Sequence, residues 1–311
     1  MTLAEAKKAH ELYKDRKVGT TLKDTAISWI TKKRDAPFFL YLATTNIHHP
    51  FTPAQRFVGT SEAGRYGDFI QELDWMVGEI LEALDRAGLT ENTLVILTSD
   101  NGGMLNQGGQ DARKVGHKQN GELLGFKFDA WEGGHRIPFI IKWPGKIPAG
   151  SKSDQLIGNI DLMASLAALV SVKLQDEDGP DSYNVLPALL GTSDRQIREH
   201  MVISPFLEAN LALRKDNWMY ISGQGGGGFG GRAVGDHDLG GPPALQFASE
   251  KNSDIENGVF KADAPSAQLY NLSNDLSESQ NVIEEFPDVA ESMARKLSAI
   301  LDSSKSSVKH E

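Results

Sequence analysis

The pattern of apolar and polar positions predicts three strands and one long helix in the first half of the chain. Residues 37–43, 93–98 and 137–144 are short apolar runs, which are typical of strands buried on both faces of a sheet. Residues 66–87 carry apolar side chains at helical spacing, and Gly88 follows where a helix commonly ends. Because strand, helix and strand follow one another, the pattern predicts a βαβ crossover and hence a parallel sheet.

Shorter elements are predicted in the rest of the chain. Helices are expected over residues 159–170, capped by Asn159, and over residues 287–301. Turn residues separate short predicted strands, which cover residues 201–204, 211–214, 218–222 and 268–272. Glycine-rich sequence predicts a loop over residues 223–231 and 236–243. At the N-terminus, residues 1–33 predict two helical segments with Gly19 and Thr20 between them.

These elements predict a division into three parts. Residues 1–199 are expected to form an α/β domain, and residues 200–302 a small α+β domain with an antiparallel sheet and a helix. Residues 303–311 are polar and are expected to form a frayed tail. With 311 residues, the chain is long enough for one large domain and a small appended one.

Polar residues follow directly after the predicted strand at residues 93–98. Asp100 and Asn101 offer adjacent oxygen ligands of the kind that calcium or magnesium prefers, and two glycines then allow a sharp turn. In open α/β sheets, ligands bind at the carboxyl ends of strands. The alternative is an ordinary strand-end turn, since Asp, Asn and Gly favour turns without any ligand.

A set of motifs around these residues resembles the sulfatase family, of the arylsulfatase A-like kind. The matching features are S-D-N-G-G after a strand, a lysine shortly before E-G-G-x-R, and a strand that ends in W-P-G at residues 143–145. The resemblance runs from about Pro37 to the C-terminal helix. It implies an alkaline-phosphatase-like α/β fold, with a mostly parallel sheet flanked by helices and a small C-terminal antiparallel sheet with a helix. The loop over residues 116–120 resembles N-acetylgalactosamine 6-sulfatase-type enzymes.

The resemblance implies roles for four residues. Asp100 and Asn101 match the family's calcium ligands, and Lys127 matches the lysine that contacts a sulfate oxygen. An ammonium group there can neutralise charge that moves onto the leaving oxygen. His48 matches the histidine of the H-x-P loop, which contacts the ester oxygen and helps to protonate the leaving group. As isolated residues, a lysine or a histidine of this kind is more commonly a solvated or structural group.

Six further residues have weaker assignments. His117 and Lys118 lie in the variable loop and are candidates for substrate binding, against the commoner alternative of solvated loop residues. Glu132 and Arg136 bracket two glycines and are expected to form a structural ion pair at the site. Phe126 and Phe128 flank Lys127 where many relatives have small residues, and they either narrow the pocket or pack against it.

The family's nucleophile has no counterpart in this sequence. Sulfatases of this type use a formylglycine made from the first residue of a C/S-x-P-x-R signature. The chain has no cysteine, and no serine stands two residues before any of its 13 prolines. The family's N-terminal aspartates, which complete the calcium site, are also absent. We therefore expect a fragment that corresponds to the C-terminal part of a sulfatase and is inactive by itself, with exposed strand edges where a central strand is missing.

Two other interpretations stay open at this point. One is a non-catalytic pseudoenzyme that binds sulfated glycans or a partner chain, such as a missing N-terminal portion of the same protein. The other is a phosphodiesterase or phosphatase of the same superfamily, which would need Asp and His clusters for two metal ions. No such cluster follows Asp100.

Composition adds limits to these interpretations. The formal net charge of -10 argues against a nucleic-acid surface. No run is long enough to cross a bilayer, and residues 1–10 lack the apolar segment of a secretory signal. The chain as given would stay in the cytoplasm, and the compartment of the native protein is left open.

Overall fold

The computed structural model describes residues 14–175, 177–228 and 240–303. Within these ranges, only the backbone of Glu208 is described. Contacts divide the chain into two compact units, residues 1–93 with 111–117 and residues 94–110 with 118–311. Each unit is described by itself. The predicted boundary at residues 199 and 200 stays a prediction, and the predicted tail lies outside the described residues after Ser303. No helix in the described part of the chain is long and apolar enough to cross a membrane.

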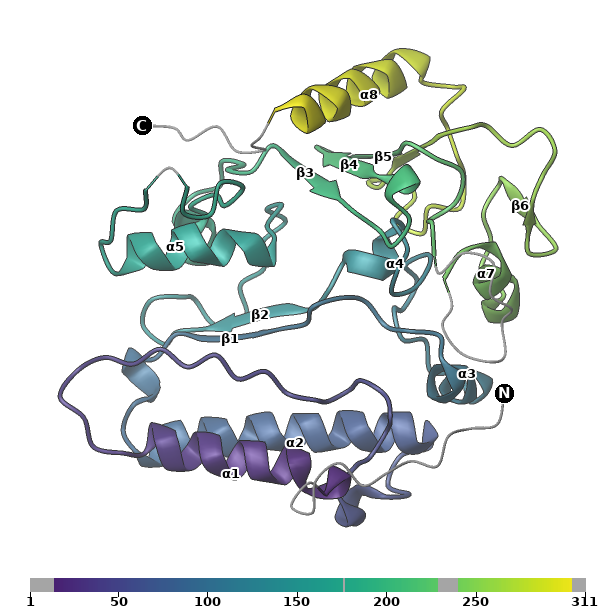
Figure 1. Cartoon of the computed structure of the whole chain (residues 1–311). Helices are drawn as coiled ribbons and strands as arrows, with labels where there is room; N and C mark the ends of the chain where they lie inside the picture. The colour runs from purple at the N-terminus through teal and green to yellow at the C-terminus, as the bar shows by residue number, and fades with distance from the viewer. Residues whose placement is uncertain (1–13, 176, 229–239, 304–311) are drawn as a thin grey trace. The chain divides into compact units, whose positions relative to one another are not determined.

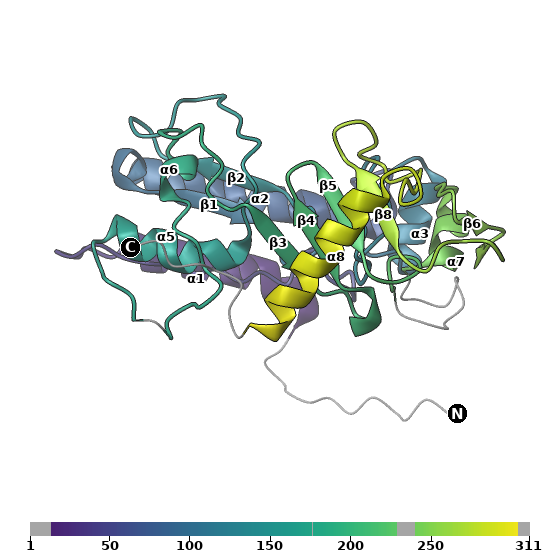
Figure 2. The ribbon, with the colours of Figure 1, turned by 90° about the horizontal axis from the view of Figure 1, so that it is seen from above.

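Two helices form the first unit. Helices α1 (Val18–Ile30) and α2 (Gly64–Arg86) lie side by side in both ribbon views (Figures 1 and 2). Three short 3-10 turns accompany them, η1 (Asp15–Lys17), η2 (Gln55–Phe57) and η3 (Thr90–Asn92). The predicted break at Gly19 and Thr20 is wrong, because α1 runs through both residues. A Cβ atom on Gly19 would lie 2.8 Å from Glu72 Oε1 and 3.2 Å from Met76 Sδ, so this glycine allows α1 to approach α2.

The long predicted helix is confirmed as α2, and it ends as the sequence predicts. Gly88 adopts a φ of +68°, its N–H donates to the carbonyl oxygen of Asp85, and Leu89 N–H donates to that of Leu84. These two bonds form a Schellman motif, which requires a left-handed residue that only glycine supplies without strain.

The predicted strand over residues 37–43 is wrong. The structure assigns no strand there, and the side chains of Phe39 and Tyr41 are 71% and 81% exposed. An apolar run becomes a strand only when a neighbouring chain takes up its N–H and C=O groups. Within the described residues no segment pairs with this run, so it stays extended and unpaired.

The second unit contains three antiparallel sheets. β1 (Val95–Thr98) pairs with β2 (Phe139–Lys142), and Thr98 lies opposite Phe139. The larger sheet has the order β3-β4-β5-β8, and the third pairs β6 with β7. The bounds of these strands are β3 (His200–Ile203), β4 (Ala212–Lys215), β5 (Trp218–Ile221), β6 (Ile255–Glu256), β7 (Val259–Phe260) and β8 (Gln268–Asn271).

The parallel pairing predicted for the α/β part is not found among the described residues, where β1 pairs with β2 antiparallel. The antiparallel sheet predicted near the C-terminus is confirmed as β3-β4-β5-β8. The physical reason is visible in the β1–β2 register. The polar segment between these strands leaves and returns at the same end, so it acts as a long hairpin excursion instead of a crossover. The four predicted short strands over residues 201–272 are confirmed, each within one residue of the observed bounds.

Several helices complete the second unit. They are α3 (Gln107–Lys114), α4 (Glu132–His135), α5 (Leu162–Leu169), α6 (Leu186–Leu189), α7 (Pro242–Ala248) and α8 (Pro287–Asp302), with the 3-10 turns η4 (Asn159–Asp161) and η5 (Glu208–Asn210). The end of α3 falls in the 111–117 segment of the first unit. The predicted loop over 236–243 is wrong at its end, because Pro242 begins α7; its start lies outside the described residues. Pro at a first helical position suits a helix start.

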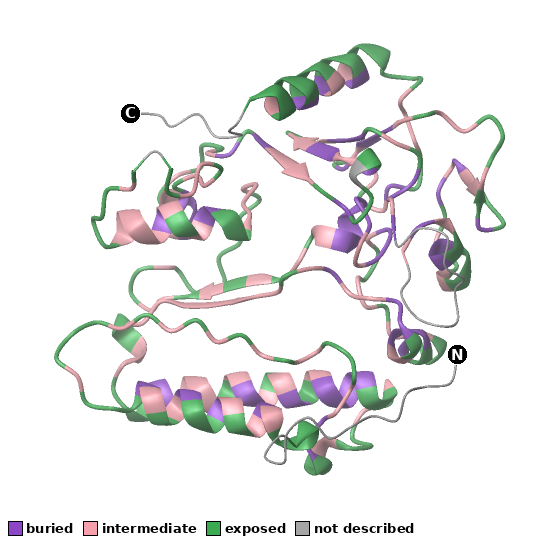
Figure 3. Ribbon diagram, in the orientation of Figure 1, coloured by how far each residue is buried: buried purple, intermediate pink, exposed green. Residues whose placement is uncertain are grey.

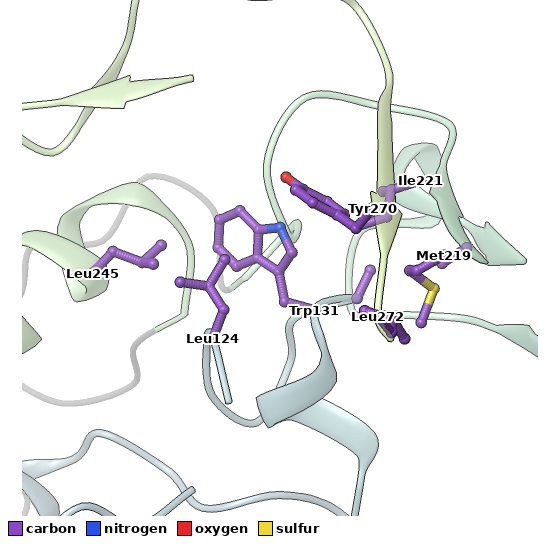
Figure 4. Packing of buried hydrophobic residues seen from close by; sticks show 9 residues of the cluster. Leu124, Trp131, Met219, Ile221, Leu245, Tyr270 and Leu272 are labelled. Carbon is purple, nitrogen blue, oxygen red and sulfur yellow. The ribbon is translucent and has the colours of Figure 1, made fainter. Parts of the chain in front are cut away.

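Two hydrophobic clusters cover the two faces of the four-stranded sheet. On one face, α8 lies across the sheet (Figure 1), and its Met293 and Leu297 pack against Leu213 and Leu269. Figure 3 shows buried positions along one side of α8 and exposed positions along the other. On the other face of the sheet, Trp131 is fully buried and packs in a cluster with residues of β4, β5 and β8, as Figure 4 shows. Its Nε1 donates to Gln268 Oε1 over 3.1 Å. The segment just before β2 is therefore anchored on the C-terminal sheet.

Candidate functional site

The turn after β1 is held from two sides. Ser99 Oγ donates to the carbonyl oxygen of Asn101 over 3.0 Å, and Asn159 Nδ2 donates to the carbonyl oxygen of Ser99 over 2.8 Å. Asn159 does not cap the following helix as predicted. Asp161 Oδ2 instead accepts the N–H of Gly158 over 2.8 Å, which leaves the Asn159 amide for the turn. The backbone around Asp100 and Asn101 is therefore fixed by side chains distant in sequence.

Backbone segments approach each other closely at the two glycines of the turn. Gly102 N–H donates to the carbonyl oxygen of Gly134 over 2.9 Å. A Cβ atom on Gly102 would lie 1.8 Å from the carbonyl oxygen of Gly133, which no side chain can accommodate. The S-D-N-G-G and E-G-G motifs thus meet as two backbones in contact, and this contact requires glycine.

Lys127 is joined to the same turn. Its N–H donates to the carbonyl oxygen of Gly103 over 2.9 Å. Asn120 strengthens the junction with three side-chain bonds, one from Gly103 N–H (2.6 Å) and two to the carbonyl oxygens of Gly103 (3.3 Å) and Gly125 (2.9 Å). The structure therefore brings Lys127 to the turn that carries Asp100 and Asn101. Sequence reasoning missed the role of Asn120, although the Gly116–Asn120 motif contained it.

The two phenylalanines beside Lys127 behave differently. Phe126 is fully buried and packs with Leu105 and Ala244. Phe128 is half-buried, adopts a φ of 87°, and contacts Phe206 edge to face at 5.8 Å between ring centroids. The Lys127 Nζ lies 5.5 Å from the centroid of the Phe128 ring. A bulky residue with positive φ is rare, so the fold imposes a strained conformation next to the candidate sulfate-binding lysine.

Glu132 and Arg136 form an ion pair across the short helix α4, through Glu132 Oε2 and Arg136 Nε. Glu132 is buried, whereas the Arg136 side chain is 45% exposed. The backbone N–H of Glu132 donates to Glu278 Oε2 over 2.7 Å. Burial, followed by the negative charge of Glu132, raises the pKa of Glu278 well above its ordinary value. Sequence reasoning missed Glu278, because no local pattern relates residues so far apart.

The two candidate residues of the variable loop, His117 and Lys118, belong to different units. Lys118 forms an exposed ion pair with Glu122, with 2.8 Å between Nζ and Oε1. His117 belongs to the first unit, where its ring lies 5.6 Å from that of Tyr66. Burial raises the pKa of Tyr66 to about 12. Their assignment to substrate binding stays a prediction.

His48 lies in the first unit, on the loop before η2. It is exposed, its Nδ1 is 2.6 Å from the carbonyl oxygen of His49, and the two imidazole rings stack at 4.3 Å. The loop is tied to α2 by Glu72, whose Oε2 accepts from Asn46 Nδ2 and from Ala54 N–H, each over 3.4 Å. Burial raises the pKa of Glu72. Glu72 is a third supporting residue that sequence reasoning missed, after Asn120 and Glu278.

The donor set at the strand-end turn suits a hard cation in type but supplies only part of a site. Asp100 is exposed and contributes a carboxylate, and Asn101 contributes an amide whose Nδ2 already donates to the carbonyl oxygen of Gly102. Among the described residues, no group of three or more His, Cys, Asp or Glu side chains is arranged to hold a metal ion. Calcium usually takes six to eight oxygen ligands.

Comparison with known proteins decides the family. The family model described as Sulfatase matches residues 11–172. The chain belongs to the sulfatase family. This sulfatase chain is 37% identical to the N-acetylgalactosamine-6-O-sulfatase of Bacteroides thetaiotaomicron, over 94% of this chain and 52% of that protein. It is 41% identical to the N-acetylgalactosamine-6-sulfatase of Canis lupus familiaris, over 55% of this chain and 33% of that protein.

Solved structures agree with this assignment. A sulfatase structure from Bacteroides thetaiotaomicron, described with the metabolism of multiple glycosaminoglycans, has a TM-score of 0.76 at 34% identity. It covers 94% of the sulfatase chain described here and 56% of its own. The PsFucS1 sulfatase from Pseudoalteromonas sp. shares the fold with a TM-score of 0.73 at 22% identity, covering 95% and 55% of the two chains. The predicted alkaline-phosphatase-like fold is confirmed, and the chain spans about half the length of the relatives it matches. Sulfatases generally use calcium.

Proposed function

We propose that the protein to which this chain corresponds hydrolyses sulfate esters of a sugar, and that this chain supplies one side of the active site. The observation that carries the proposal is the bond between Lys127 N–H and Gly103 O, which joins the lysine turn to the Asp100–Asn101 turn. In the proposal, Lys127 neutralises a sulfate oxygen and stabilises charge on the leaving oxygen. His48 donates the proton that the leaving group takes up.

Support for a sugar substrate comes from the relatives. The two curated relatives cited above are named N-acetylgalactosamine-6-O-sulfatase and N-acetylgalactosamine-6-sulfatase. We therefore propose a hexosamine 6-sulfate, or a glycan that carries one, as the substrate class. The net charge of -10 would repel a polyanionic glycan at long range, so recognition falls to local cations such as Lys127.

We further propose that Asp100 and Asn101 contribute two oxygen ligands to a calcium ion. Bound calcium would place a second positive charge beside the sulfate group. Replacing Asp100 by Asn removes the only carboxylate of the pair and should weaken calcium binding by at least about tenfold, measured by isothermal titration with calcium chloride. Equal affinity in the variant would remove these residues from the metal site.

The proposed activity is tested on the protein purified from the cells that make it. Hydrolysis of N-acetylgalactosamine 6-sulfate is followed by sulfate release, and Lys127→Ala should lower kcat/KM by about 100-fold or more. The control is Lys152→Ala, because Lys152 is an exposed lysine outside the site. The isolated chain of 311 residues should give no turnover, since it contains no C/S-x-P sequence from which the family's nucleophile is made. Turnover by the isolated chain would contradict this assignment of the nucleophile.

A further inference from the structure

Asp129, two residues after Lys127, is buried and enclosed by glycines from three segments. Its side chain is 3% exposed. A Cβ atom on Gly125, Gly226 or Gly240 would lie 2.7 to 2.8 Å from one of its carboxylate oxygens. The carboxylate therefore fits only because none of these three neighbours has a side chain. Water is excluded, and the group depends on protein donors for its hydrogen bonds.

Two backbone N–H groups donate to this carboxylate, one from each side. Phe126 N–H donates to Oδ2 over 2.8 Å, and Gly241 N–H donates to Oδ1 over 2.8 Å. Phe126 precedes Lys127, whereas Gly241 precedes α7. One side chain thus joins the turn that presents Lys127 to a segment more than a hundred residues later in the chain.

The turn has several other fixed points, among them Asp129 N–H, which donates to the carbonyl oxygen of Phe126 over 2.9 Å, and the carbonyl oxygen of Phe128, which accepts the N–H of Phe206 over 3.2 Å. On its other side, Lys127 N–H donates to Gly103 O, and Ala130 N–H donates to the carbonyl oxygen of Gly226 over 2.6 Å. The strained φ of Phe128 lies between these bonds. A conformation of this kind persists only where its surroundings determine it fully, so losing one bond should let the Lys127 turn relax.

We propose that Asp129 is a positioning residue for Lys127, whose carboxylate holds the lysine turn in place by accepting from Phe126 and Gly241 at once. This proposal rests on the proposed function, because the position of Lys127 matters for sulfate binding only if Lys127 contacts the sulfate. Both oxygens must be free to accept. A protonated carboxyl group carries a hydrogen on one oxygen, which makes that oxygen a much weaker acceptor, so protonation weakens one half of the double link.

The charges around Asp129 put this change near neutral pH. Burial raises the pKa of Asp129 to about 7, the two N–H donors oppose the rise, and the negative charge of Glu250 adds to it. Glu250 Oε2 accepts the N–H of Gly125, one of the three glycines that enclose Asp129, over 3.1 Å. Above about pH 7 the link is complete, and below it one half of the link weakens progressively.

The test follows backbone amides of the 311-residue chain by NMR between pH 5.5 and 8.5. The amide signals of Phe126 and Gly241 should titrate together with a midpoint near 7, and the hydrogen-exchange protection of Lys127 N–H should fall about tenfold as the pH drops through it. Asp129→Asn should abolish both changes and leave Lys127 weakly protected at every pH. Glu250→Gln should lower the midpoint, because it removes the neighbouring negative charge. Asp263→Asn, an exposed acid elsewhere, is the control and should change nothing.

A second readout separates this proposal from the proposed function. The affinity for inorganic sulfate, followed at the Lys127 signals at pH 8, should be about tenfold weaker in Asp129→Asn than in the wild type. If Lys127→Ala leaves the sulfate affinity of the protein purified from its source cells unchanged while the amides and the Lys127 exchange respond as expected, the positioning role stands and the proposed role of Lys127 in sulfate binding is contradicted. If Lys127 protection does not follow the titration in the wild type, the positioning role is overturned. That wild-type measurement needs no variant to fold.

Discussion

At the scale of single residues, the structure supports its candidate site with buried carboxyl groups. Glu278 is fully buried and accepts the N–H of Glu132, while its Oε1 has no hydrogen-bond partner. The Asp129 carboxylate accepts two backbone N–H groups, one of them in the turn that carries Lys127. The Glu72 carboxylate ties the loop that carries His48 to α2. Each group joins a loop to an element distant in sequence. Their cost is desolvation, which raises their pKa values.

For Glu278, the raised pKa means that burial favours the protonated over the ionised side chain in the folded protein. Glu278→Gln should then change the free energy of unfolding by less than about 1 kcal/mol, because the amide oxygen can accept the Glu132 N–H. Glu278→Ala should cost about 1–3 kcal/mol, since it leaves that N–H buried without a partner. Urea unfolding at pH 7 measures both. Equal losses in the two variants would show that Glu278 is ionised in the folded protein.

For Asp129, the shift predicts how stability depends on pH. The folded-state pKa is about 7 and the ordinary value is 3.8, so between these values the folded state binds more protons than the unfolded state. Stability should therefore decrease as the pH rises from about 4 to about 7, and change little through this group above that range. Asp129→Asn should remove this part of the slope in thermal unfolding followed from pH 4 to 8. A slope identical to that of Asp263→Asn would contradict the shift.

At the scale of elements, the candidate site depends on two glycine turns that meet through their backbones. Gly102 faces Gly133 and Gly134, which belong to α4. Trp131 anchors the start of α4 to the C-terminal sheet, and Glu278 anchors it to the loop after β8. The β1–β2 hairpin returns the chain to the same end of the sheet, which brings the two motifs together. The position of Lys127 therefore depends on the packing of a sheet that contributes no candidate catalytic residue.

This contact predicts a large difference between two glycine substitutions. Gly102→Ala should destabilise the chain by about 1–3 kcal/mol or more, because its Cβ would overlap the carbonyl oxygen of Gly133 and neither backbone can yield easily. Gly78→Ala is the matched control within α2, where an added Cβ meets nothing within 4 Å. It should stabilise by about 0.5–1 kcal/mol through helix propensity. Chemical denaturation of both variants tests the comparison, and equal effects would exclude the close approach.

At the scale of the whole molecule, the structure leaves apolar side chains in contact with solvent. Phe39 and Tyr41 on the unpaired run and Ile140 on β2 are 71%, 81% and 60% exposed. β1, predicted to be buried on both faces, has four residues of intermediate burial. These side chains form apolar surface that contacts solvent.

We expect this surface to cause self-association of the isolated chain. The double variant Phe39→Ser and Tyr41→Ser should reduce the concentration-dependent increase in light scattering, because it removes two adjacent aromatic side chains from an unpaired extended segment. The control is Val259→Ser, which removes an apolar side chain that is 63% exposed on β7. If association is unchanged in the double variant, or is reduced equally in the control, the surface that causes self-association lies elsewhere.

The sequence by itself determined the family and the local elements. Short-range patterns carry that information: the S-D-N-G-G and E-G-G-x-R motifs, the helical spacing that defines α2, the glycine at its end, and the alternating strands near the C-terminus. Each depends on residues within about one helical turn or one strand of each other, and the physics of turns and caps acts over that distance.

Tertiary structure alone decided strand direction, strand pairing and the support of the site. The 37–43 run has an apolar pattern suited to a strand, but only a partner could make it one, and none is present among the described residues. Asn120, Asp129 and Glu278 look like ordinary polar residues in the sequence, because their roles depend on N–H and C=O groups brought close by folding. A hydrogen bond acts only at contact distance. The sequence could therefore name Lys127 as the candidate, and only the folded chain shows what holds it.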